Sequence, residues 1–102
     1  MADKTAIICP VKTANTPSIK SSSTALAANS DRSSWNIQNL GTNTLYVRLG
    51  SGASTSVFHF ALKAGSVNDD GTGGSVGQSE GVVWTGIITV AGTSPRYTVY
   101  ET

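Results

Sequence analysis

The chain has 102 residues, a formal net charge of +1 and only 13% charged residues. A chain of this length forms one domain and buries roughly 60 to 70% of the surface that it exposes when unfolded, so it can build a small core without metal or disulfide cross-links. The Lys and Arg residues are spread along the sequence, so no basic patch is present for a phosphate backbone, and nucleic-acid binding is not expected. Ser and Thr make up about a quarter of the chain, which favours a β protein or an extracellular-facing part of an assembly.

Targeting signals are not evident in the sequence. The single cysteine, Cys9, cannot form a disulfide within the chain, so nothing indicates folding in an oxidising compartment. The apolar patch near the start is too short for a secretory signal or a membrane span, and it ends at Pro10. We therefore expect a protein that is made and folded in a cytoplasm and has no membrane partner.

Residues 1–20 are polar apart from one strand-forming patch, Thr5–Cys9, in which Ile7 and Ile8 are the large apolar side chains. Two prolines follow the patch, and proline removes a donor from a β-ladder. We therefore predict that residues 1–20 form an extended N-terminal arm or edge strand, and that residues 21–102 form a single β-sandwich domain.

The most regular pattern lies within Arg32–Gly50. Two runs of strand-forming residues, 35–39 and 45–49, flank a segment of small and polar residues, 40–44. Alternate residues of the second run are apolar, as in a strand that rests one face on a core. The pattern predicts a β-hairpin with one dry face, because Gly and Asn can adopt the positive φ angles of a tight reversal.

Residues 57–62 form a further predicted strand, in which Phe58, Phe60 and Leu62 share one face. Residues 65–81 are rich in glycine and polar side chains, and we expect a long loop there with almost no contact to the core. Loops of this length in a small domain are usually functional or mobile.

The rest of the chain also favours strands. Residues 82–90 are the longest apolar run and the best candidate for a central strand, and residues 96–101 are β-branched and aromatic. Residues 24–28 are too short for an amphipathic helix, so we expect a strand or a loop there. Roughly six short strands separated by turn residues predict an all-β protein, a single antiparallel β-sandwich that is jelly-roll-like and carries an extended N-terminal arm.

No set of residues predicts catalysis. His59, the only histidine, has no acid or nucleophile at a recognisable spacing, so we expect it on a strand surface or in an interface. Asn68–Gly71 contains oxygens of the kind that bind calcium, but the EF-hand spacing is absent and Asx residues before glycine are ordinary turn residues. We therefore predict a non-enzyme without catalytic residues, cofactor or metal site.

Because no catalytic set is evident, we expect the outward side chains of the predicted strands to contact a partner protein. Tyr46 and Arg48 point away from the apolar face of the 45–49 strand, and Tyr and Arg are enriched where protein interfaces bind most strongly. We predict a partner interface that contains Tyr46, Arg48, His59, Ile7 and Ile8.

The sequence also resembles small structural proteins of tailed bacteriophages. The resemblance is carried by an Arg, a short strand ending in Gln-Asn, a small-residue turn and an aliphatic-Tyr-Val-Arg strand ending in Gly, which together span Arg32–Gly50. Segments 60–65, 84–90 and 97–101 fit the same pattern, so it covers roughly residues 20–102. The resemblance implies a capsid decoration (cement) protein, a compact and often trimeric β-sandwich that bridges capsomers and stabilises the shell without chemistry.

We therefore expect a virion structural protein on the capsid surface, made in the host cytoplasm, whose partners are the major capsid protein and further copies of itself in a homotrimer. A phage neck or tail adaptor is one alternative, and it predicts a ring of higher order. A small glycan-binding module is another, with Trp35, Trp84 or Tyr46 as its stacking surface and residues 65–81 as its rim. We also expect residues 1–20 to order on a neighbouring subunit, which unchanged oligomerisation and capsid binding after their deletion would contradict.

Overall fold

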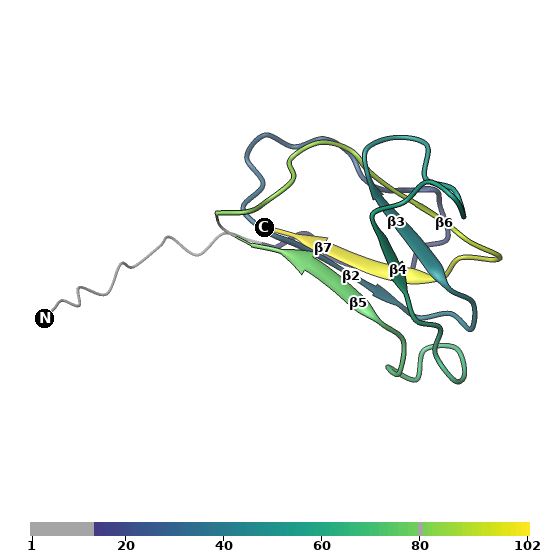
Figure 1. Ribbon diagram of the computed structural model, residues 1–102. Helices are drawn as coiled ribbons and strands as arrows, with labels where there is room; N and C mark the ends of the chain where they lie inside the picture. The colour runs from purple at the N-terminus through teal and green to yellow at the C-terminus, as the bar shows by residue number, and fades with distance from the viewer. Residues whose placement is uncertain (1–13, 80) are drawn as a thin grey trace, which may run out of the picture.

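The computed structural model describes residues 14–79 and 81–102. Within them lie seven strands, which are β1 (Thr24–Leu26), β2 (Trp35–Asn39), β3 (Leu45–Leu49), β4 (Phe60–Leu62), β5 (Ser75–Gln78), β6 (Ile88–Ala91) and β7 (Tyr97–Glu101). They form two antiparallel sheets, one with the strand order β1-β6-β3-β4 and one with the order β5-β2-β7. The sheets pack face to face (Figure 1), so the predicted all-β sandwich is confirmed.

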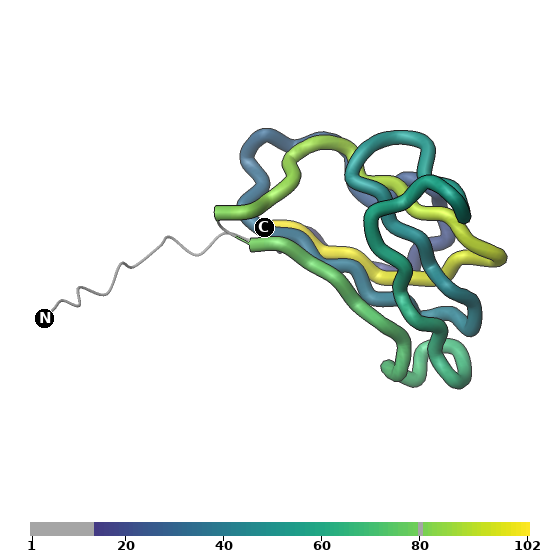
Figure 2. Tube along the Cα trace, viewed as in Figure 1, coloured from purple at the N-terminus to yellow at the C-terminus, as the bar shows by residue number. Residues whose placement is uncertain are grey.

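The connections give the sandwich a jelly-roll topology. The chain crosses from one sheet to the other after every strand except β3, which forms a hairpin with β4 (Figure 2). Residues 15–20 lie along the outer edge of β7, where Asn15 bonds to Glu101 and Lys20 bonds to Tyr97. With this irregular edge segment the smaller sheet also has four members, and two such sheets joined by crossing connections make a jelly roll. The described part of the predicted arm or edge strand therefore lies at a sheet edge.

The strands at 35–39 and 45–49 are those predicted, but the predicted hairpin between them is wrong. β2 belongs to the smaller sheet and β3 to the larger one, so residues 40–44 cross over the end of the sandwich. Ile37 and Val47 both face the core with 0% exposure. The same alternation of apolar residues suits two strands side by side and two strands face to face, because each arrangement needs one dry face per strand.

The predicted loop at 65–81 is wrong in part, because Ser75–Gln78 form β5 and pair with β2. An edge strand is held by backbone hydrogen bonds to its neighbour, so β5 needs few of the apolar side chains that mark a strand in the sequence. The predicted strand at 82–90 is confirmed only for its last residues, which form β6 between β1 and β3. Val82 is 72% exposed, in the segment that leads to β6.

Phe58 does not share the inward face of Phe60 and Leu62, as the alternation predicted. A bridge between Ser54 and Val57 turns the chain, and β4 begins only at Phe60. Leu62 is buried, whereas Phe58 is 40% exposed on the outside of the sheet. Phe58 therefore lies before the start of β4, and the alternation of the strand does not determine which way its side chain points.

The core lies between the two sheets and is built from the inward side chains of both. Its largest fully buried apolar members come from four strands, and they are Trp35, Ile37, Leu45, Val47, Ile88, Val90, Tyr97 and Val99. Burial raises the pKa of the Tyr97 phenol, whose hydroxyl donates to the carbonyl oxygen of Ser22 at 2.8 Å. The core is small, as expected for a chain of this length.

The buried side chain of Arg32 joins three segments at one end of the sandwich. Its Nε donates to Oε1 of Glu101 at 2.9 Å. Its two terminal nitrogens donate to the carbonyl oxygens of Ala27, Trp84 and Gly86 at 2.6, 2.9 and 3.0 Å. The Arg32 side chain has 0% exposure, so this end of the fold depends on one fully buried cation with its hydrogen bonds satisfied.

Asn39 has the corresponding role at the other end of β2, where it is 1% exposed. Its Nδ2 lies 2.9 Å from the carbonyl oxygen of Asn43, 3.2 Å from that of Leu62 and 3.1 Å from that of Lys63. Its Oδ1 accepts from the backbone N–H of Gly41 at 2.9 Å. One side-chain amide thus ties the crossing segment between β2 and β3 to the end of β4.

Candidate protein-binding surface

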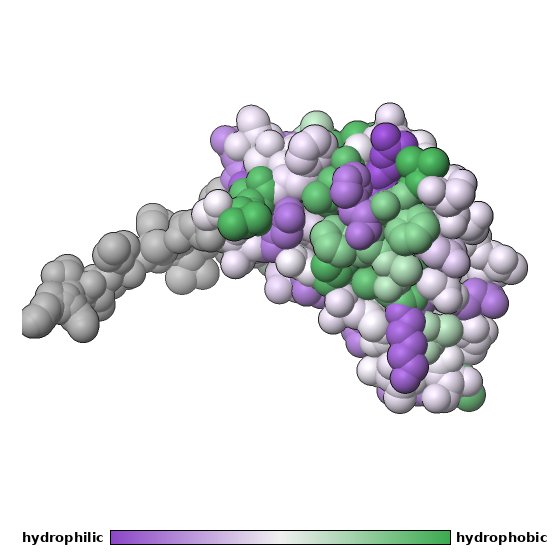
Figure 3. Space-filling model, in the orientation of Figure 1, coloured by the Kyte–Doolittle hydropathy of each residue, from purple (hydrophilic) through white to green (hydrophobic). Residues whose placement is uncertain are grey.

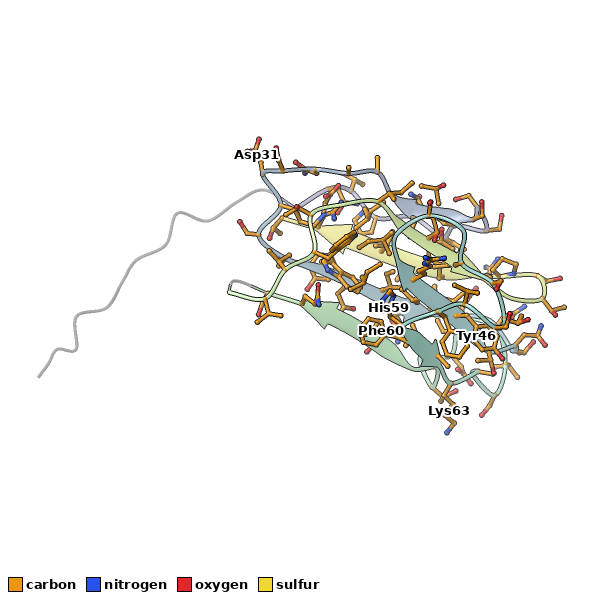
Figure 4. All side chains as sticks on the ribbon, turned by 45° about the horizontal axis from the view of Figure 1, so that its top comes forward. Asp31, Tyr46, His59, Phe60 and Lys63 are labelled. Atoms are coloured by element: carbon orange, nitrogen blue, oxygen red, sulfur yellow. The ribbon has the colours of Figure 1, made fainter. Side chains whose placement is uncertain are left out.

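The outer face of the larger sheet brings together three of the five predicted interface residues. Tyr46 and Arg48 point outward from β3, where they alternate with the buried Leu45 and Val47. His59 lies on the same side, directly before β4, which pairs with β3 (Figure 4). The other two predicted residues, Ile7 and Ile8, lie outside the described residues.

An aromatic contact forms the centre of this surface. The rings of Tyr46 and Phe58 lie 4.8 Å apart between centroids, at an interplanar angle of 54°. Phe58 is 40% exposed and its neighbour Val57 is 43% exposed. We name Tyr46, Val57 and Phe58 the aromatic patch. Figure 3 shows apolar residues gathered over the side of the molecule on which β4 lies.

The loop that carries Val57 is tied to the sheet by hydrogen bonds. The Thr89 hydroxyl on β6 donates to the carbonyl oxygen of Gly50 at 2.6 Å and accepts from the backbone N–H of Ala53 at 3.1 Å. Ser54 Oγ accepts from the backbone N–H of Val57 at 3.0 Å. The patch is therefore preorganised, which lowers the entropy cost of binding a partner.

His59 contacts the backbone of β3. Its Nδ1 accepts from the backbone N–H of Leu49 at 3.0 Å, so its ring is fixed against the end of β3. Its own backbone N–H donates to the carbonyl oxygen of Val47 at 2.7 Å. These two hydrogen bonds extend the pairing of β3 and β4 by one residue, and they fix the His59 ring at the edge of the surface beside Arg48.

The carboxylates of the 68–71 segment have partners within the protein. Both oxygens of Asp69 accept from Arg96, at 2.7 and 2.6 Å, and this contact lowers the pKa of the Asp69 carboxyl. Asp70 accepts from the hydroxyl and backbone N–H of Thr72 and from the N–H of Val67, and these bonds lower its pKa. In the part of the chain that the structure describes, no three His, Cys, Asp or Glu side chains lie close enough together to hold a metal ion.

A groove of about 620 Å³ lies at the end of the sandwich where Asn39 is buried. Its lining is mostly hydroxyl and amide side chains, and the residues are Ile19, Lys20, Ser21, Thr42, Asn43, Asn68, Ser94, Pro95 and Arg96. This lining contains no carboxylate, imidazole or thiol.

The two tryptophans differ in exposure. Trp35 is 1% exposed and its indole N–H donates to Oε1 of Gln78 at 3.0 Å, so it is not available as a stacking surface for a sugar. Trp84 is 39% exposed, and its indole N–H donates to the carbonyl oxygen of Ile87 at 2.9 Å. Its ring covers Gly86 so closely that a Cβ at that position would lie 2.6 Å from it.

We expect acrylamide to quench Trp84 several times more effectively than Trp35. In a Trp84→Phe variant the remaining fluorescence should be blue-shifted and weakly quenched, because Trp35 lies in the core. A Trp35→Phe variant keeps the exposed indole and is the matched control. Equal quenching constants for the two variants, both folded by circular dichroism, would contradict the burial of Trp35.

Comparison of the chain with protein-family models, with curated proteins and with solved structures gives no significant match. Within the described ranges, no helix is long and apolar enough to cross a bilayer. Sequence reasoning missed Val57 and Phe58 as members of the surface. The signal that could have found them is the Ser-rich segment 54–56, whose hydroxyls favour a turn directly before them.

Proposed function

We propose that the protein is a non-enzymatic structural protein of a bacteriophage virion, a capsid decoration protein that binds the major capsid protein on the outer capsid surface. The observation that carries the proposal is the aromatic patch of Tyr46, Val57 and Phe58, with Arg48 and His59 beside it. A decoration protein made in the host cytoplasm needs a preorganised contact surface and no reaction chemistry. Working as a homotrimer, it would bridge neighbouring capsid subunits.

The chemistry of the patch supports contact with a protein. Burial of apolar surface contributes about 25 cal/mol per Å², and aromatic and Arg side chains are the usual anchors of protein interfaces. The Tyr46–Phe58 pair offers two rings already in contact, so a partner can cover both at little cost in side-chain entropy. The jelly roll supports the proposal only weakly, because both viral capsid and lectin domains use that fold.

We expect a Tyr46→Ala/Phe58→Ala double variant to lose at least tenfold in affinity for shells assembled from the major capsid protein of the same phage. The loss corresponds to about 1.4 kcal/mol, the lower range for two anchor side chains. Co-sedimentation of purified protein with undecorated shells measures it. Tyr100→Ala is the matched control, because Tyr100 is also exposed, at 43%, but lies on the smaller sheet.

Unchanged shell binding by the folded double variant would remove the aromatic patch from the interface. Absence of binding by the unmodified protein would contradict the capsid proposal itself. A ring of more than three copies that binds no shell would favour the neck or tail adaptor instead.

A further inference from the structure

One side of the sandwich is open. The edge strands β4 and β5 meet only near Gly74, whose backbone N–H donates to the carbonyl oxygen of Lys63 at 2.9 Å. From that point the two strands diverge, β4 following the larger sheet and β5 the smaller one (Figures 1 and 2). Opposite this opening, residues 15–20 lie along β7 and close the other side.

Inward side chains at the opening are only partly covered. Phe60 pairs with Val47 across the larger sheet, and Val76 pairs with Ile37 across the smaller one. Val47 and Ile37 are fully buried, whereas Phe60 and Val76 are only partly buried although they face the same core. Val83 packs against the core in the same partly buried way. We name Phe60 and Val76 the seam; Figure 4 labels Phe60 on β4.

The outer edge of β5 has no bonding partner among the described residues. The backbone hydrogen bonds of Ser75–Gln78 all belong to the ladder with β2. On the opposite side of the sandwich the edges have partners: residues 15–20 bond to β7, the carbonyl oxygen of Thr24 on β1 accepts from Tyr97, and that of Ala25 accepts from Lys20. An uncovered edge next to an uncovered apolar seam is the arrangement that accepts an additional strand.

We propose that the strand-forming patch Thr5–Cys9 of a second copy of this chain pairs with the outer edge of β5 and covers the seam. Residues 1–13, when extended, span at most about 45 Å, which is long enough to reach a neighbour. We place Ile8 toward Phe60 and Val76, so that alternation turns Ile7 and Cys9 to the outer face, on which the exposed Ser75 also lies. Pro10 then ends the ladder, because it has no N–H to donate.

Strand direction favours a second copy over the molecule's own arm. Asn15 bonds to Glu101, and Trp35 pairs with both Glu101 and Gln78, so Asn15 lies at the Gln78 end of the smaller sheet. If Thr5–Cys9 paired with β5 of the same molecule, Cys9 would lie at the Gln78 end because it is nearer to Asn15 in the chain. The added strand would then run parallel to β5. The five pairs between the named strands of the described residues are all antiparallel, the slightly more stable arrangement. The arm of a second copy can approach in the antiparallel direction, with Cys9 at the Ser75 end.

In a closed ring of copies, each copy adds its Thr5–Cys9 strand to β5 of one neighbour and accepts the same strand from the other neighbour. No β5 edge is then left unpaired. It needs no capsid protein, so it can be tested on the isolated full-length chain. It also gives Ile7 and Ile8 the interface role that the sequence predicted for them.

Disulfide trapping distinguishes the two directions, because Cys9 is the only native cysteine. Ser75→Cys and Ser79→Cys place a second thiol at opposite ends of β5, at positions that are both exposed. We expect copper-phenanthroline oxidation of the Ser75→Cys protein to give covalent dimers and higher multiples on a non-reducing gel. Thr55→Cys is the control, because Thr55 is exposed on the side of the larger sheet. This variant should form no covalent multiple and should run as a single chain on the same gel. An intramolecular link in Ser79→Cys, or no intermolecular link in Ser75→Cys, would overturn the exchange.

Sedimentation at low micromolar concentration tests the same inference without cysteines. We expect the unmodified protein to sediment as an oligomer and the Ile7→Asp/Ile8→Asp variant as a folded monomer. Thr13→Asp adds a charge outside the patch and should keep the oligomer. An oligomer that survives the double substitution would count against the exchange. Loss of the oligomer with shell binding intact would support it and leave the capsid proposal standing.

Discussion

Replacing Arg32 with alanine is expected to lower the free energy of unfolding by about 3 to 5 kcal/mol, the cost of removing one partner from a buried ion pair. The substitution deprives the carbonyl oxygens of Ala27, Trp84 and Gly86 of their donor and leaves the Glu101 carboxylate without its cation. Small domains are stable by only about 5 to 15 kcal/mol, so much of the margin disappears. Urea unfolding followed by circular dichroism measures the difference.

Arg96→Ala is the matched control for this prediction. Arg96 makes a two-bond contact with Asp69, but both side chains are well exposed, at 37% and 40%. Water screens such a pair, so its loss should shift the unfolding midpoint by a small fraction of the Arg32→Ala shift. Equal shifts for the two variants would show that the contribution of Arg32 to stability does not depend on its burial.

Asn39→Asp is expected to destabilise the protein by about 3 kcal/mol at neutral pH. The substitution turns a donor into an anion that faces the carbonyl oxygens of Asn43, Leu62 and Lys63. Gln38→Glu makes the same chemical change at the preceding position of β2, but on a partly exposed side chain, and should cost much less. Urea unfolding of both variants at pH 7 measures the contrast.

The Asn39→Asp penalty should also depend on pH. Burial among carbonyl oxygens raises the folded-state pKa of the new carboxyl above its unfolded value of about 3.9. Below the unfolded pKa the group is protonated in both states, so most of the penalty is absent. The penalty grows as the pH rises from the unfolded toward the folded pKa, and it is complete above the folded pKa. A difference from the unmodified protein that is the same at pH 4 and pH 7 would contradict the buried contact.

The sequence predicted strands well where side chains alternate and poorly where the backbone alone holds them. Val47 and its neighbours mark β3 by period-two burial, and Tyr46 was correctly predicted to face outward. β5 has the sequence Ser-Val-Gly-Gln, with one large apolar residue, and it forms because β2 offers it a ladder. Pairing was not predictable for the same reason, since alternation does not say which strand lies beside which.

The contacts made by Arg32 could not be predicted from the sequence, because nothing around a charged residue shows that it will be buried. Its partners lie 5, 52, 54 and 69 positions away along the chain. The aromatic patch was half predicted: Tyr46 follows from alternation, whereas Phe58 is placed by the turn at Ser54–Val57. Local pattern therefore gives the faces of strands, and the ends of the sandwich are set by contacts between distant segments.

The crossing connections also determine how fast this chain can fold. Among the seven described strands, only β3 and β4 are consecutive in the chain and adjacent in a sheet. By contrast, Trp35 bonds to Gln78 43 positions later, and Asn15 bonds to Val99 84 positions later. Bringing such distant segments together costs loop-closure entropy before any pairing repays it. β2 must wait, with its apolar face uncovered, until β5 and β7 have been synthesised. The topology thus places this small domain among slow folders, in the range of about milliseconds to seconds, and makes the nascent chain dependent on its last strand.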